Sequence, residues 1–412
     1  MHPFQTVHCW FIRVFTFVFL FGCTNILYSQ YDPLLGIRVD VVYLASDVLE
    51  GRETGTPGEM MAAEYIAHRM KEIGLSPKGS EDWFYEFSFK ANPHGGPKID
   101  GKGRNVVGFL NKKAKKTIVI GAHYDHLGYG GSGSRSPNEK AIHNGADDNA
   151  SGIAAMLWLA ENLKNEKKLK FNILFIAFSG EEMGLLGSKA FIEKPTIPHE
   201  SIHAMINMDM VGRLNAEKTM AISGVGTAIE WKTHLDNCRM PGFQFNYSDG
   251  GIGPSDHTAF YLKNIPAIHF FTGQHQDYHK PSDDSHLVNY EGIREVSEII
   301  WGLLIHLSDK PVLTFQKTKD EDKQRASSFK VTMGVMPDYV YNGEGMRVDA
   351  VLDNRPAQKA GLMGGDIIIK IGSFDIKDVY QYMEALSKFE KGQSADVTVK
   401  RKEEVLVKQV VF

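Results

Sequence analysis

The feature that most restricts the fold of this sequence is a series of short apolar segments separated by helical patterns. Each segment has the length and the β-branched or aromatic content of a buried strand. The segments span residues 105–110, 117–122, 172–178, 204–208 and 267–271. Helical patterns follow at residues 151–165, 228–237 and 290–307. Strands that alternate with helices predict an α/β fold, with a mostly parallel central sheet and helices on both faces.

Side chains that can bind metal ions follow three of these strands directly. His123 follows the strand at residues 117–122, and Asp209 follows the strand at residues 204–208. Glu181 and Glu182 come just after the strand at residues 172–178. In open α/β sheets the carboxyl ends of the strands line one crevice, so we expect these residues to converge there.

Two further polar clusters belong to the same expected crevice. NGADDNASG at residues 144–152 opens a helix, and DYHKPSDD at residues 277–284 follows the strand at residues 267–271. An isolated Asp at such a position is usually a helix N-cap. Several carboxylates that converge on one crevice repel one another, however, and need a bound cation to stay ionised together. Two zinc ions meet this requirement.

A pair of zinc ions needs two imidazoles, two outer carboxylates and one shared carboxylate. The sequence offers His123, Asp147, Glu182, Asp209 and His279. Glu181 then remains beside a ligand as a candidate general base, which accepts a proton from water and delivers it to a leaving amine.

Together these motifs resemble those of di-zinc exopeptidases of the bacterial leucyl aminopeptidase type, which are relatives of glutamate carboxypeptidase and glutaminyl cyclase. The resemblance rests on HYDH, NGADDNASG, SGEEMGLLGS, NMDMVG, PSDHTAFY and YHKPSDD, in the family's order between residues 41 and 307. ASDVLEGRETGTPG, at residues 45–58, also looks like the start of such enzymes.

The resemblance assigns a role to each candidate residue. Asp147 bridges the two zinc ions. His123 and Asp209 complete one site, and Glu182 and His279 complete the other. By the same resemblance, Glu181 would be the general base of a metallo-aminopeptidase that acts on peptides.

Residues beside the ligands are expected to support them. Asp125 and Asp283 would accept the second ring N–H of the two ligand histidines, which fixes the tautomer. Asp148 would hold the backbone beside the bridging acid. Tyr278 would polarise the scissile carbonyl, as the residue before the ligand histidine does in some relatives.

Other functions stay open at this point. Carboxypeptidase action is a weaker alternative, because Arg213 alone does not make a clear site for a substrate carboxylate. Glutaminyl cyclases work with one zinc and lack the first histidine, which His123 supplies here. A receptor-like peptide-binding scaffold would have a degenerate site, whereas this set of ligands is intact.

Two segments near these motifs need their own interpretation. H-E-x-x-H at residues 199–203 matches a zinc-binding pattern that requires both histidines on one helix face. Pro195 and Pro198 precede it and a strand follows at once, so we interpret the match as a coincidence. The glycine- and serine-rich insertion at residues 128–140 is expected to form a lid over the site or a disordered tip.

The composition changes after residue 315. The densely charged residues 316–328 predict a linker between an exopeptidase domain at residues 31–315 and a small α+β domain at residues 329–412. The small domain resembles a bacterial PDZ domain. MGVM at residues 333–336 would be its carboxylate-binding loop, and PAQKAGL at residues 356–362 precedes GDII. Such domains bind a peptide C-terminus by strand addition.

The amino terminus predicts export. Residues 1–30 resemble a signal peptide, with Arg13 before the apolar segment at residues 14–22. Cleavage after Ser29, lipid attachment at Cys23 and an uncleaved anchor all remain open, and each places the enzyme in the periplasm, outside the cell or on the cell envelope. Such an anchor is the only expected membrane contact. The net charge of -4 argues against a nucleic-acid partner.

Overall fold

The computed structural model describes most of the chain after the predicted signal peptide. It describes residues 32–91, 99–131, 133–136, 138–318, 331–337, 343–351, 355–377, 379–402 and 404–412. The predicted signal peptide, and all of the predicted linker except residues 316–318, lie outside the described residues. No helix within the described ranges is both long and apolar enough to cross a membrane.

A nine-stranded sheet forms the centre of the larger domain, in the order β1-β3-β5-β4-β6-β9-β7-β8, with β2 paired to β3. Its strands are β1 (Ser76–Pro77), β2 (Phe84–Ala91), β3 (Ile99–Leu110), β4 (Thr117–His123), β5 (Asn172–Phe178), β6 (Ile202–Met208), β7 (Thr219–Ser223), β8 (Gln244–Tyr247) and β9 (Ala267–Phe271). All five strands expected from the sequence are present. Every residue of β4, β5 and β9 is buried, which explains why these segments are continuously apolar.

The sheet is parallel at its centre and antiparallel around it. β5, β4, β6 and β9 pair in parallel, as do β7 and β8. β3 pairs antiparallel with β5, and β7 pairs antiparallel with β9. The predicted α/β fold is confirmed, and the parallel pairing is concentrated in the strands that carry the candidate site.

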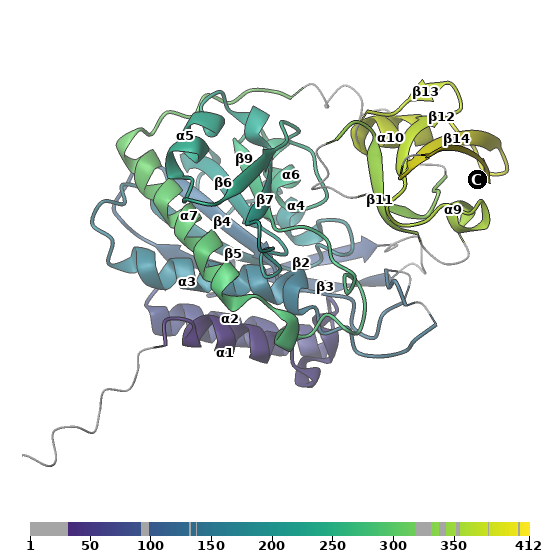
Figure 1. Cartoon of the computed structure of the whole chain (residues 1–412). Coiled ribbons are helices and arrows are strands. Elements are labelled where there is room, and N and C mark those ends of the chain that lie inside the picture. The colour runs from purple at the N-terminus through teal and green to yellow at the C-terminus, as the bar shows by residue number, and fades with distance from the viewer. Residues whose placement is uncertain are drawn as a thin grey trace, which may run out of the picture. The chain divides into compact units, whose positions relative to one another are not determined.

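Helices cover both faces of this sheet (Figure 1). They are α1 (Leu35–Leu44), α2 (Pro57–Ile73), α3 (Gly152–Lys164), α4 (Leu186–Glu193), α5 (Trp231–Cys238), α6 (His257–Tyr261) and α7 (Tyr290–Asp309). α3 packs against α2 and α7, whereas α4 and α6 pack against each other. The sequence sets the ends of α2, because Thr56 caps its first turn, Pro57 opens it and Gly74 closes it with a φ of 90°.

The smaller domain contains a separate six-stranded sheet in the order β10-β11-β12-β14-β15, with β13 paired to β12. Its strands are β10 (Val335–Pro337), β11 (Met346–Val351), β12 (Ile367–Ile371), β13 (Phe374–Asp375), β14 (Ser394–Arg401) and β15 (Glu404–Val411), and its helices are α9 (Pro356–Lys359) and α10 (Val379–Leu386). It has its own apolar core, which includes Met346, Leu362 and Val397. The predicted small α+β domain is confirmed.

Candidate metal centre

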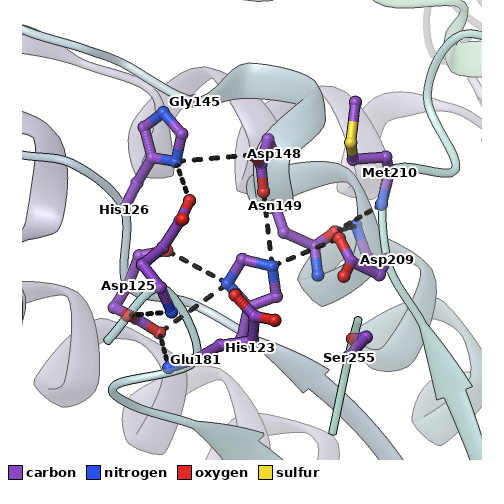
Figure 2. A network of polar contacts seen from close by, with 12 residues as sticks. His123, Asp125, His126, Gly145, Asp148, Asn149, Glu181, Asp209, Met210 and Ser255 are labelled. Carbon is purple, nitrogen blue, oxygen red and sulfur yellow. Dashed lines mark hydrogen bonds and ion pairs between the residues drawn. The ribbon is translucent and has the colours of Figure 1, made fainter. Parts of the chain in front are cut away.

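Three titratable side chains meet beyond the carboxyl ends of β4 and β6 (Figure 2). The Nε2 atom of His123 lies 3.3 Å from Oδ1 of Asp148 and 3.2 Å from Oδ1 of Asp209. His123 and Asp148 are buried, and the pocket that they line reaches Glu181 and Tyr278. One imidazole and two carboxylates at these separations form a donor set suited to a single zinc ion.

A second group shares the carboxylate of Asp148. The Nε2 atom of His279 lies 3.2 Å from Oδ2 of Asp148 and 3.3 Å from Oε2 of Glu182. One oxygen of Asp148 therefore faces His123, while the other faces His279. A carboxylate placed in this way can bridge two metal ions.

The structure corrects the position expected for the bridging acid, because Asp147 faces away from both groups. Its Oδ1 accepts hydrogen bonds from the backbone N–H of Gly212 and from the hydroxyl of Ser151, at 2.6 and 3.0 Å. Its Oδ2 lies 3.2 Å from Nε2 of His275. Adjacent residues project in different directions, and the turn at residues 146–151 directs Asp148, not Asp147, into the crevice.

The ring N–H partners of the two histidines also differ from expectation. The Nδ1 atom of His123 lies 3.2 Å from the backbone carbonyl of Asp125, closer than the 3.7 Å to Oδ1 of its carboxylate. The Nδ1 atom of His279 lies 2.9 Å from the carbonyl of Gly133. The expected pairing of Asp283 with His279 is therefore wrong. Oδ2 of Asp283 instead accepts the backbone N–H groups of Asp147 and Asp148, at 2.9 and 3.1 Å.

The insertion at residues 128–140 supports His279 directly. Besides the carbonyl of Gly133, the backbone N–H of Arg135 donates to the carbonyl of His279 at 2.9 Å. In the described residues the insertion is therefore part of the support of a candidate ligand, which the sequence interpretation as a lid or a disordered tip did not foresee. Its glycines and serines gave no signal for this role.

The carboxylate of Asp125 holds the turn that carries the two glutamates. Its Oδ1 accepts the backbone N–H of Glu181 at 3.1 Å, and its Oδ2 accepts that of Glu182 at 3.3 Å. Thr54 donates its hydroxyl to the same carboxylate at 3.1 Å. Asp125 therefore positions both glutamates relative to β4.

The electrostatics of Glu181 suit a group that exchanges protons. Burial raises the pKa of Glu181 well above its usual range. The charge of His123 lowers this pKa, whereas the carboxylates of Glu182, Asp209 and Asp256 raise it. Burial likewise raises the pKa of Asp256 to about 7. A carboxyl group whose pKa moves toward neutrality is a more effective general base at neutral pH.

The carboxylates around the two imidazoles favour the protonated form of each ring. Although burial opposes it, Glu182 and Asp148 raise the pKa of His279 to about 10. The pKa of His123 is also raised, by Asp209 and Glu181 against the effect of burial. Buried His and carboxylate groups this close fit a pair of cations, which would take over the neutralising role of the ring protons.

Zinc binding is therefore expected to release protons at pH 7.5, because the pKa of His279 is raised to about 10 and that of His123 is also raised, whereas a ligand imidazole must be deprotonated. Titration calorimetry of the zinc-stripped protein in buffers with different ionisation enthalpies measures this number. We expect about two protons per chain when both ions bind. Release of none would contradict the assignment of the two histidines.

Tyr278 and apolar side chains complete the wall of the pocket. The ring of Tyr278 stacks on that of His279 with centroids 3.9 Å apart. It packs in a small apolar cluster with Met210, Ala221 and Phe271, which all line the pocket. One wall is thus polar and the other is apolar, as expected of a site that binds an apolar side chain next to a reacting peptide bond.

A buried arginine ties the loops of the centre together, and the sequence interpretation missed it. Arg52, in the helical turn Asp47–Arg52 within the motif ASDVLEGRETGTPG, is 1% exposed. Its guanidinium donates to the backbone carbonyls of Leu44, Tyr124, Asn144 and Gly145. The carbonyls of Asn144 and Gly145 precede the turn that carries Asp148, and that of Tyr124 lies in the loop after β4. Burial lowers the pKa of Arg52 to about 10, so it stays charged at neutral pH.

Replacing Arg52 with Met is expected to lower the free energy of unfolding by roughly 3 kcal/mol or more, because several buried carbonyls lose a charged donor at once. Denaturant unfolding of the zinc-loaded protein measures the change. Arg38→Met is the control, since the Arg38 guanidinium lies over the ring of Tyr290 at 4.6 Å, a contact worth about 1 kcal/mol or less at an exposed site. Equal losses in the two variants would contradict the role of Arg52.

The H-E-x-x-H match at residues 199–203 does not lie on one helix. His199 is in a short 3-10 turn (His199–Ser201) and His203 is in β6. The ring of His203 stacks on Phe171 instead, with centroids 5.1 Å apart. The interpretation of this pattern as a coincidence is confirmed.

Two parts of the chain match the profiles of known protein families. Residues 105–304 match the profile of Peptidase family M28, and residues 314–410 match that of the PDZ domain. Among curated proteins, the chain is 31% identical to the "Alkaline phosphatase isozyme conversion protein" of Escherichia coli over 43% of this chain and 51% of that protein. It is 27% identical to "Aminopeptidase YwaD" of Bacillus subtilis, over 48% of this chain and 43% of that protein. The chain thus spans about half the length of these relatives.

Solved structures show a similar fold. An aminopeptidase, LapA of Legionella pneumophila, aligns with a TM-score of 0.51 and 23% identity over 66% of this chain and 71% of its own. A glutaminyl cyclase of Bacteroides thetaiotaomicron aligns with a TM-score of 0.55 and 18% identity over 67% of this chain and 98% of its own. At these identities the likeness extends to the fold alone.

Proposed function

Because the chain carries a Peptidase family M28 domain followed by a PDZ domain, we propose that it is an exported metallo-aminopeptidase that holds two zinc ions and hydrolyses the N-terminal bond of peptides. The observation that carries the proposal is the placement of Asp148, whose two carboxylate oxygens face two separate histidines. Aminopeptidases among the relatives support the same activity.

The donor sets divide between the two ions. His123, Asp148 and Asp209 would hold one ion, and Asp148, Glu182 and His279 would hold the other. When bound, two zinc ions polarise the scissile carbonyl and lower the pKa of water toward neutrality.

The side chains of this protein would carry the proton transfer. Glu181 accepts the proton of the attacking water and passes it to the nitrogen of the leaving amine. Asp125 keeps Glu181 in place through its backbone N–H. Tyr278 lines the same pocket beside His279, where it can donate a hydrogen bond to the carbonyl oxygen of the scissile bond.

The surroundings of Arg213 argue against carboxypeptidase action. Its NH2 group lies 3.2 Å from Asp277 and 3.3 Å from Asp283, so its charge is paired within the protein. An arginine held in this way is a poor receptor for a substrate carboxylate. The apolar wall formed by Met210, Ala221 and Phe271 instead favours substrates whose first side chain is apolar.

The decisive experiment compares three substrates at known zinc content. The zinc-loaded protein is expected to release the chromogen from leucine p-nitroanilide and to leave the N-acetylated form intact. It should also leave a peptide with N-terminal glutamine uncyclised. Release from the blocked substrate only, cyclisation of glutamine, or turnover that persists after zinc removal would contradict the proposal.

The remaining assignments follow from the sequence. We propose that residues 1–30 direct export to the periplasm, the cell envelope or the medium, with any membrane contact made through an N-terminal lipid or anchor. We also propose that the PDZ domain binds the C-terminus of a peptide, as PDZ domains do by strand addition.

A further inference from the structure

A third imidazole stands at the candidate metal centre, and neither the sequence interpretation nor the comparisons give it a role. His126 follows β4 in the motif HYDH and is 1% exposed. Its Nδ1 atom lies 2.9 Å from Oε1 of Glu182. The same atom lies 3.7 Å from Oδ2 of Asp148 (Figure 2). These are the same two carboxylates that face His279.

The two imidazoles approach this carboxylate pair from different directions. The rings of His126 and His279 are nearly perpendicular, at 73°, with centroids 5.7 Å apart. His279 faces Oε2 of Glu182, whereas His126 faces Oε1. His126, Asp148 and Glu182 each offer a ligand atom within 4.8 Å of the others, and His279 contacts both of these carboxylates. Two imidazoles and two carboxylates are the number and kind of donors that a four-coordinate zinc ion takes.

The local backbone makes room for this ring and fixes its place. A Cβ atom on Gly145 would lie 2.6 Å from the ring carbons of His126, so only glycine leaves the space that the imidazole fills. The backbone N–H of His126 donates to the carbonyl of Arg52 at 3.2 Å. Among the described residues, Nε2 of His126 has no hydrogen-bond partner, so the ring's polar contacts are all on the side of the carboxylates.

We propose that His126 is a direct ligand of the second zinc ion, together with Asp148, Glu182 and His279. The inference rests on the two-zinc centre proposed above. It gives the two zinc ions different numbers of protein ligands. The second ion has four protein donors, which is the closed coordination of structural zinc sites. The ion at His123 and Asp209 has three, so an open position for water and substrate lies on that side. The four-donor ion should also bind first.

X-ray absorption at the zinc edge tests the proposal on the full chain loaded with one equivalent of zinc. The wild-type spectrum is expected to show two imidazoles per zinc, from His126 and His279. His126→Gln is expected to show one. His143→Gln is the matched control, because His143 is a buried neighbour with its ring 6.5 Å from that of His126, and its Nε2 pairs with Ser134 at 2.8 Å. This control should keep two imidazoles.

Chelator competition gives a second readout on the same proteins. Loss of a residue that only hydrogen-bonds to a ligand lowers metal affinity by roughly 10- to 100-fold, so loss of a ligand should exceed about 100-fold. One imidazole per zinc in the wild-type protein, or a smaller loss of affinity in His126→Gln, would overturn the proposal while leaving the two-zinc centre intact. A wild-type protein that binds no zinc would instead overturn the proposed function.

Discussion

Replacing Glu181 with Gln is expected to lower kcat by roughly 10²- to 10⁴-fold while both zinc ions stay bound, because the amide cannot accept the proton of the attacking water. Glu181 lines the pocket but does not belong to either donor group, so the ligands stay in place. The backbone contact to Asp125 is also unaffected, since it uses the N–H of residue 181. Turnover of leucine p-nitroanilide, with zinc quantified on the same sample, measures the effect.

Glu193→Gln is the control for this substitution. Glu193 lies at the exposed end of α4, where it pairs with Lys263, so the same chemical change there should leave kcat unchanged. A Glu181→Gln protein that retains full kcat would refute the proposed base. One that loses its zinc would show that Glu181 is a ligand instead.

Replacing Asp148 with Asn is expected to remove both zinc ions and lower kcat/KM by more than about 100-fold, because both donor groups lose the same charged ligand. The wild-type protein should hold two ions per chain after dialysis against zinc-buffered solution, and the variant less than one. Zinc quantification after dialysis, followed by the leucine p-nitroanilide assay, checks both parts.

Asp147→Asn is the matched control, because it makes the same change one residue away. Asp147 bonds to Gly212, Ser151 and His275 rather than to the candidate ligands, so this variant should keep two zinc ions. If the Asp148→Asn protein keeps its zinc and the Asp147→Asn protein loses it, Asp147 is the bridging residue, as expected from the sequence.

The sequence alone determined the architecture of the larger domain and most of the candidate residues of its site. The apolar segments that became β4, β5 and β9 are buried along their whole length, and a strand buried on both faces has to be apolar throughout. His123, Glu182 and Asp209 were proposed because polar residues just after such strands stand out, and His279 because it lies in the polar cluster DYHKPSDD at residues 277–284. The ends of α2 could also be read from the sequence, because Thr56, Pro57 and Gly74 set them through local backbone effects.

Only the tertiary structure decided which neighbouring polar residue faces the crevice. Asp147 and Asp148 have the same chemistry, and the choice depends on contacts with Gly212, His275 and Asp283, which lie more than sixty residues away in the chain. The contacts of Arg52, Gly133 and His126 depend on loops that approach one another only in the folded protein. A buried strand leaves a continuous apolar segment, which can be recognised in the sequence. The direction of a side chain in a turn is set instead by the residues that pack against it, and these come together only in the folded protein.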